Sequence, residues 1–197
     1  MDHHAVNDEA LDTIFRAART QNKWQDKPVS VAHLMAVYDL MRFGPTSANC
    51  SPARFLFLTT PEAKQRLAQF ASNANKPKIL SAPATAIIGY DLDFASHLPK
   101  LFPNDQTART WFADPAVEQA TAFRNGTLQG AYFIVAARAL GLDCGPMSGF
   151  DNAKVDAEFF AGTRVKSNFI CGVGYGDPSG VFARSPRLDF DEACKIL

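Results

Sequence analysis

The chain lacks most of the patterns that mark a self-sufficient catalytic or metal centre. It has no GxxxxGK[ST] phosphate loop and no HExxH zinc motif, and its four cysteines and four histidines are scattered without metal-ligand spacing. The absence of any CxxC pair disfavours both a zinc site and a disulfide framework, and we expect no metal. Without a Ser/His/Asp arrangement, an enzyme built this way must take its chemistry from a cofactor.

An excess of one charge and long apolar runs are also absent. Twenty basic and twenty acidic residues cancel among 197, so no charged tail points to nucleic acid or to a membrane surface. No stretch approaches the roughly 18 consecutive apolar residues of a membrane span. Residues 1–5 are polar, unlike a signal or transit peptide. We therefore expect a cytoplasmic protein whose partner is a small molecule.

Helical and strand patterns alternate along the chain without repeats or linkers. Helices are predicted over 8–19, 31–43, 61–71, 73–80, 115–140, 152–160 and 190–197, and strands over 54–59, 84–90 and 165–175. This order predicts a single α+β or α/β domain over residues 1–197. Prolines interrupt the segment 92–114, which is typical of a lid or an insertion.

The helix predicted to begin at Pro115 is the longest. Its second half, 131–137, is apolar nearly all round, so both of its faces must be covered. A chain of this size has few elements left to do so. A second subunit is therefore the natural cover.

A polar loop bounded by Pro45 and Pro52 joins the second helix to the first strand. Because proline lacks an N–H group and restricts the residue before it, the backbone between them should be rigid and irregular. Thr46, Ser47 and Asn49 offer short hydrogen-bonding groups that suit a polar ligand. An ordinary connection built of Asx and Ser/Thr turns would have the same composition.

Glycine-bearing and basic stretches are the candidates for a phosphate site. The stretch 172–176 follows a strand but opens no helix, so the dinucleotide fingerprint fails. The turn expected at 145–149, between two helices, would expose N–H groups to a ligand or would be a plain turn. Four arginines are candidate phosphate ligands: Arg16, Arg19, Arg184 and Arg187. Helix-dipole compensation and a solvated loop explain them separately.

Taken in order, these pieces resemble the FMN-dependent nitroreductase superfamily over nearly the whole chain. The resemblance rests on the stretches 18–20, 44–49, 75–78, 145–151, 174–176 and 184–187. Within the superfamily, GPTSANCSPARF, TAFRN, LGLDCGPMSGFD and GYGD are most similar to the malonic semialdehyde reductases of bacterial pyrimidine degradation. The resemblance implies an α+β fold with a mixed sheet flanked by helices, in an intertwined homodimer with two FMN molecules at its interface.

The resemblance also implies which residues hold the flavin. The phosphate and ribityl end would be held by Arg19, Thr20, Arg184 and Arg187. The loop that reaches the flavin from the partner subunit would supply Pro45, Thr46, Ser47 and Asn49. The remaining contacts would be Asn75 and Lys78 near the pyrimidine ring, and Pro146, Met147, Ser148 and Gly149, with backbone N–H groups near N5 and O4. Asn22 and Ser148 depart from the family pattern, which usually has a basic residue and often a glutamate there.

By the same resemblance, NADH or NADPH reduces a small carbonyl substrate, malonic semialdehyde, to 3-hydroxypropionate by ping-pong hydride transfer through flavin N5. Lys78 would offset the charge that reduced flavin carries at N1. Trp111, Phe112 and Arg124 are candidates for a substrate cover and a carboxylate clamp, with core packing and an exposed ion pair as alternatives. Three other interpretations stay open: a nitroaromatic or quinone reductase, a flavin-storing or ligand-sensing dimer, and a cofactor-free interaction module.

Overall fold

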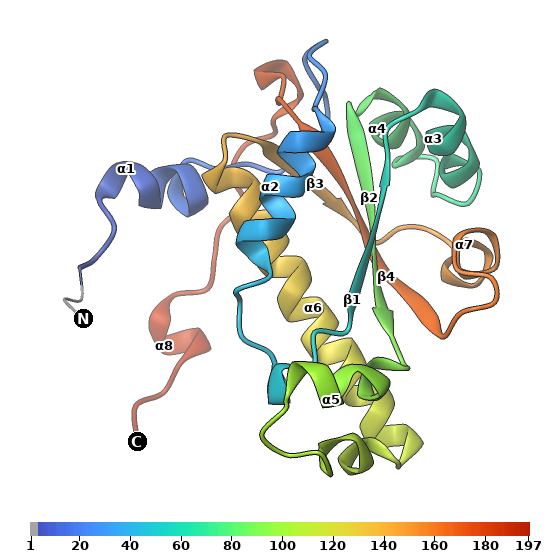
Figure 1. Ribbon diagram of the computed structural model, residues 1–197. Helices are drawn as coiled ribbons and strands as arrows, with labels where there is room; N and C mark the ends of the chain where they lie inside the picture. Colours follow the sequence, from blue (N-terminus) through green and yellow to red (C-terminus); the bar gives the residue numbers. More distant parts are fainter. Residues whose placement is uncertain (1–3) are drawn as a thin grey trace.

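A four-stranded sheet lies between two layers of helices (Figure 1). The computed structural model describes residues 4–197, so the first three residues of the polar N-terminal stretch lie outside it. The strand order is β1-β2-β4-β3, with bounds Ala53–Leu58 (β1), Ala84–Asp91 (β2), Asp143–Met147 (β3) and Val165–Gly174 (β4). The strands pair antiparallel throughout. A mixed sheet was expected. Within residues 4–197, the only parallel pairing is the single bridge between Thr20 and Cys144.

Helices α2 (Val31–Met41) and α6 (Pro115–Ala139) cover one face of the sheet (Figure 1). Their buried residues form one core cluster with the inward side chains of the strands, around Phe133 and Ile88. His33 on α2 donates from Nε2 to the carbonyl oxygen of Leu140 at 3.0 Å, which ties α2 to the end of α6. α2 packs on α6 within the same chain and covers part of the predicted apolar stretch, while Ala131 stays exposed and Tyr132, Ile134 and Val135 stay half-buried.

Helices α3 (Pro61–Ala68), α4 (Lys76–Ser81) and α7 (Asn152–Phe159) cover the opposite face (Figure 1). Their core cluster is a second set of aliphatic and aromatic side chains around Leu67, Ile79 and Ile170. The helix starts on both faces follow local capping chemistry. Four N-cap side chains accept backbone N–H groups of the first helical turn: Ser30, Thr60, Asp114 and Asp151.

The irregular segment 92–114 forms a small layer at one end of α6. It contains α5 (Leu98–Leu101) between two 3₁₀ turns, Phe94–His97 and Ala108–Phe112. Its apolar side chains pack with Cys50 and Tyr90 in a third cluster. The segment is a packed unit that adjoins the polar loop after α2.

Three predicted elements differ from the structure. The first helix, α1 (Asp8–Leu11), continues only as a wide turn to Arg16, because the following residues extend toward their bridge with the sheet. The expected turn 145–149 begins as strand β3, where Pro146 is tolerated because β3 is an edge strand. The last helix, α8, spans only Phe190–Ala193.

Both ends of the described chain project from the helical layers (Figure 1). None of the residues of α1, of the wide turn after it or of α8 is buried. Within residues 4–197, no helix combines the length and the apolar character that crossing a membrane requires.

Candidate functional site

Five arginines line one cavity of about 620 Å³ between the N-terminal segment and the C-terminal segment. They are Arg16, Arg19, Arg138, Arg184 and Arg187, and Thr20 and Asn22 lie beside them. No acidic residue is among the residues that line it in the described chain. Arg16 is neutralised by Asp8 and Asp12, each at 2.7 Å. The other arginines keep their charge for a ligand, so the cavity suits a phosphate.

Two of these arginines connect the N-terminal and C-terminal segments by hydrogen bonds, and we call this pair of contacts the clasp. Arg19 donates from Nη2 to the carbonyl oxygen of Phe182. In return, Arg184 donates from Nη2 to the carbonyl oxygens of Arg16 at 2.7 Å and Ala18 at 3.2 Å. Within the part of the chain that the structure describes, Arg187 donates only to carbonyls of its own turn, at Ser185 and Pro186. The predicted Arg19, Thr20, Arg184 and Arg187 therefore meet at one place, although the sequence separates them widely.

Edge strand β3 connects this cavity to a second group of predicted residues. The N–H of Gln21 donates to the carbonyl oxygen of Cys144 at 3.0 Å, next to the Thr20–Cys144 bridge. Further along, Pro146 and Met147 end the strand, and the exposed residues Ser148 and Gly149 follow it. The side chain of Met147 is buried in the core, so only its backbone is available to a ligand.

The N-terminal end of α4 adjoins the end of β3. Asn75 donates from Nδ2 to the carbonyl oxygen of Gly149 at 3.2 Å, and the N–H of Ser72 donates to the same oxygen at 2.9 Å. A Cβ at Gly149 would lie 2.9 Å from Asn75 Nδ2 and 3.0 Å from Ser72 Oγ. A side chain at Gly149 would therefore require the side chains of Asn75 and Ser72 to move. Lys78 is half-buried one turn further along the same helix.

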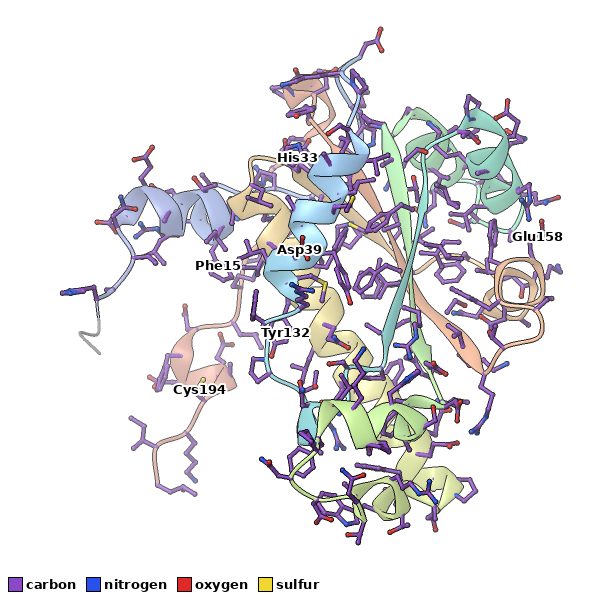
Figure 2. The ribbon with its side chains drawn as sticks, in the orientation of Figure 1. Phe15, His33, Asp39, Tyr132, Glu158 and Cys194 are labelled. Atoms are coloured by element: carbon purple, nitrogen blue, oxygen red, sulfur yellow. The ribbon has the colours of Figure 1, made fainter. Side chains whose placement is uncertain are left out.

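The polar loop Pro45–Asn49 lies elsewhere in the chain. Figure 1 shows the segment after α2 beside α5, at the opposite end of the sheet from α4. Tyr132 on α6 donates its hydroxyl to the carbonyl oxygen of Pro45 at 3.0 Å, and Figure 2 places Tyr132 beside this segment. One chain therefore does not bring the loop together with Asn75 and Lys78.

The loop is irregular, as its bounding prolines predict, and its backbone is also strained. Ala48, Asn49 and Ser51 have φ values of 48°, 50° and 40°, a region that residues with a Cβ adopt at a cost. Hydrogen bonds with segments distant in sequence hold the loop in this conformation. Asn125 on α6 accepts the N–H of Ser47 at 2.9 Å, and Asn49 donates from Nδ2 to the carbonyl oxygen of Leu101 at 2.8 Å. Backbone strain that contacts with distant segments maintain is typical of a functional loop.

Replacing Asn125 with leucine is expected to destabilise the protein by about 0.5–1.5 kcal/mol, because it removes the part-buried hydrogen bond that Asn125 accepts from the N–H of Ser47. Asn125 is 2% exposed, so water does not replace the lost bond easily. Urea unfolding measures the change, and limited proteolysis should cut between residues 45 and 52 sooner. Ala120→Ser, at an exposed position of the same helix, should leave both measurements unchanged.

Comparison with known proteins agrees with this arrangement of motifs. The model of the Nitroreductase family matches residues 4–176. The chain belongs to the nitroreductase family. It is 60% identical over 188 residues to a protein of Caulobacter sp. (strain K31) with the provisional name NADH dehydrogenase/NAD(P)H nitroreductase, covering 95% of this chain and 96% of the relative. It is 58% identical over 190 residues to HadB of Ralstonia pickettii, which has the same provisional name, covering 95% and 97%.

A solved structure shares the fold of this nitroreductase chain. A protein of Exiguobacterium sibiricum 255-15, provisionally described as a nitroreductase and crystallised in complex with FMN, superposes with a TM-score of 0.86 at 16% identity, covering 100% of both chains. At that identity the likeness concerns the fold alone.

The three predicted substrate residues do not lie beside the other candidate residues at the edge of β3. Phe112 is 9% exposed and packs edge-on against Phe94, with ring centroids 4.9 Å apart, which favours its core-packing alternative. Trp111 is 50% exposed and contacts Phe102 edge-on at 6.0 Å. Arg124 is exposed on α6 and forms no ion pair within residues 4–197. Trp111 and Arg124 thus remain available to a substrate that approaches from outside the chain.

Two further features of the candidate residues and their surroundings were not predicted from the sequence. Arg138 lines the arginine cavity from the last turn of α6, where a basic residue is ordinarily explained by the helix dipole. Its Nη1 donates to the carbonyl oxygen of Ile14 at 3.0 Å. Cys50, inside the strained loop, is buried, and burial raises the pKa of its thiol to about 11. Cys50 is therefore a packing residue and not a nucleophile.

Proposed function

We propose that this chain is an FMN-dependent oxidoreductase that uses NADH or NADPH to reduce a small carbonyl substrate, malonic semialdehyde, to 3-hydroxypropionate. The observation that carries the proposal is the cavity of arginines at the edge of β3, which no carboxylate lines in the described chain. We treat residues 1–197 as one FMN-binding domain. The family, the provisional names of the relatives and the composition of the cavity all support an oxidoreductase that uses NAD(P)H.

The donor set of the arginine cavity fits the phosphate of FMN. A phosphate dianion needs several N–H donors and positive charge, and guanidinium groups supply both in a fixed plane. Arg19, Arg184 and Arg187 would bind it, with the hydroxyl of Thr20 beside them. Arg138 adds a further cation to the lining, which offsets the loss expected from Asn22, where the family usually has a basic residue.

The edge of β3 fits the polar rim of the flavin ring. The exposed residues Ser148 and Gly149 would present backbone N–H groups, while Asn75 and Lys78 on α4 would donate to the pyrimidine oxygens and offset negative charge. Bound FMN supplies reversible two-electron chemistry, so one site serves the nicotinamide and the carbonyl in turn, with ping-pong kinetics. The residues of the chain would bind and orient the flavin and the substrate and polarise the substrate carbonyl. None of them needs to act as a nucleophile.

A homodimer would complete this site. The loop with Pro45, Thr46, Ser47 and Asn49 has an exposed edge but lies at the opposite end of the sheet from α4 (Figure 1). A second copy of the chain would place its loop over the ring held by the first. The same arrangement would bring the partner's insertion, with its exposed tryptophan, over the substrate. Free cysteines in the described chain fit a reducing cytoplasm.

The test is the visible spectrum of the purified protein during anaerobic titration. Bound flavin absorbance should bleach on addition of NADPH or NADH and return on addition of malonic semialdehyde, with 3-hydroxypropionate as the product. Propanal, which lacks the carboxylate, is the matched control and should have a much lower kcat/KM. Sedimentation of the loaded protein should give the mass of a dimer. A colourless protein that takes up no added FMN would overturn the proposal.

A second candidate is a nitroaromatic or quinone reductase, which the provisional names of the relatives favour. It predicts the same bleaching with NAD(P)H but return with nitroaromatics or quinones, and little discrimination between malonic semialdehyde and propanal. A flavin-storing dimer would bind FMN and bleach slowly or not at all. The same titration therefore separates the three candidates.

A further inference from the structure

Lys64 on α3 is a cation buried without a carboxylate. It is 9% exposed, and no Asp or Glu pairs with it within residues 4–197. Burial lowers the pKa of its ammonium group, because taking a charge out of water disfavours the charged form. An apolar side chain of the same length would avoid this penalty. The ammonium must therefore provide contacts that an apolar residue does not.

Those contacts are the last carbonyl groups of α4. Lys64 donates from Nζ to the carbonyl oxygen of Leu80 at 3.1 Å and to that of Ala82 at 2.7 Å. The C-terminal carbonyls of a helix have no partner within it, and a cation there also interacts favourably with the helix dipole. α4 has only six residues, so its own hydrogen bonds fix it weakly. Lys64 thus anchors its C-terminal end to α3.

The other end of α4 carries the candidate flavin contacts. Asn75 occupies the N-cap position and its side chain donates to Gly149, and Lys78 is the third residue of the helix. Six residues rise only about 9 Å, so a shift or tilt at Leu80 is transmitted directly to Asn75. At a polar binding site, a misplacement of about 1 Å is enough to lose most of the benefit of a hydrogen bond.

We propose that Lys64 is a positioning residue of the cofactor site: its ammonium group fixes the C-terminal end of α4, and this holds Asn75 and Lys78 beside Ser148 and Gly149. The inference rests on the proposed function. Lys64 binds the C-terminal end of α4, at carbonyls two and four residues beyond Lys78, and acts only through the helix. A role confined to local stability would instead change unfolding without changing the affinity for FMN.

The test compares Lys64→Met, Lys64→Gln and Lys64→Arg with the wild type. FMN affinity of the apoprotein is measured by fluorescence titration at a temperature where every variant is folded, and hydrogen exchange of the 76–82 amides is measured alongside. Lys64→Met should bind FMN about 10-fold or more weakly and exchange faster over 76–82. Lys64→Arg and Lys64→Gln keep donors for the two carbonyls and should restore affinity in part, which keeps the test usable if the methionine variant does not fold.

Arg66→Met is the matched control on the same helix, because Arg66 is exposed and pairs with Glu158 on α7 at 2.6 Å. It should bind FMN as the wild type does. If the Lys64 variants bind FMN within twofold of the wild type, the positioning role is wrong even though the proposed function stands. If the wild type itself binds no FMN, the proposed function fails instead.

Discussion

Arg19→Ala and Arg184→Ala are each expected to weaken FMN binding by about 10- to 100-fold, the effect of losing a charge-assisted hydrogen bond to a phosphate. Each substitution removes a guanidinium group from the cavity and also breaks one half of the clasp between the terminal segments. The measurement is equilibrium titration of the apoprotein with FMN at two salt concentrations. The loss should shrink at high salt, because screening already weakens the wild-type interaction.

Three controls separate charge from the clasp. Arg187→Ala removes a charge from the same cavity, but within the described chain its donors go only to its own turn, so any loss reports phosphate binding alone. Arg184→Lys keeps the charge without the planar fork and should recover part of the affinity. Arg42→Ala removes an exposed cation that pairs with Asp39 at 3.5 Å and should change nothing. If Arg19→Ala and Arg184→Ala bind FMN as tightly as Arg42→Ala, the cavity is not the phosphate site.

The parts of the fold that could be predicted are those decided by neighbours in sequence. Thr60 accepts the N–H of Ala63, and Asp151 accepts that of Lys154, so each cap is written within four residues of the chain. The strands β1, β2 and β4 are apolar runs between breakers and were predicted within a residue or two of their bounds. Local chemistry of this kind needs no knowledge of the tertiary structure.

The parts that could not be predicted depend on contacts between distant segments. β3 contains Gly145 and Pro146, which favour a turn locally, and is a strand only because β4 and the Thr20 segment pair with it. Lysine is ordinarily a surface residue. Lys64 is buried because α4 places two carbonyl groups beside its ammonium group. Asn125 likewise accepts the N–H of Ser47 only because α6 passes under the polar loop.

The candidate site was predicted by resemblance, not by local chemistry. Spacing alone does not indicate that Arg19 and Arg184 share a cavity, because 164 intervening residues separate them and each has an ordinary explanation. The structure unites the arginines and links them through β3 to Asn75. The Pro45 loop, by contrast, lies at the opposite end of the sheet from α4 (Figure 1), which is the physical reason to expect that two chains build each site.

Gly145→Ala is expected to destabilise the protein by about 1–3 kcal/mol, the usual cost of overpacking, and to weaken FMN binding about 10-fold or more. A Cβ at Gly145 would lie 2.5 Å from the backbone oxygen of Gln21 and 3.3 Å from Cζ2 of Trp24. β3 cannot move away, because Gly145 is paired with Gly172 of β4. The Gln21 segment must shift instead, and Arg19 and Thr20 shift with it.

Urea unfolding and FMN titration of Gly145→Ala measure the two effects independently. Gly162→Ala is the matched control: Gly162 has a φ of 76° and open space around its Cβ position, so it should show backbone strain of about 1 kcal/mol and wild-type affinity for FMN. Since Gly145 contacts the backbone of Gln21 and not a flexible side-chain tip, the neighbour has no rotamer by which to relieve the clash. A Gly145→Ala protein with unchanged FMN affinity would mean that the N-terminal segment does not set the position of the phosphate site.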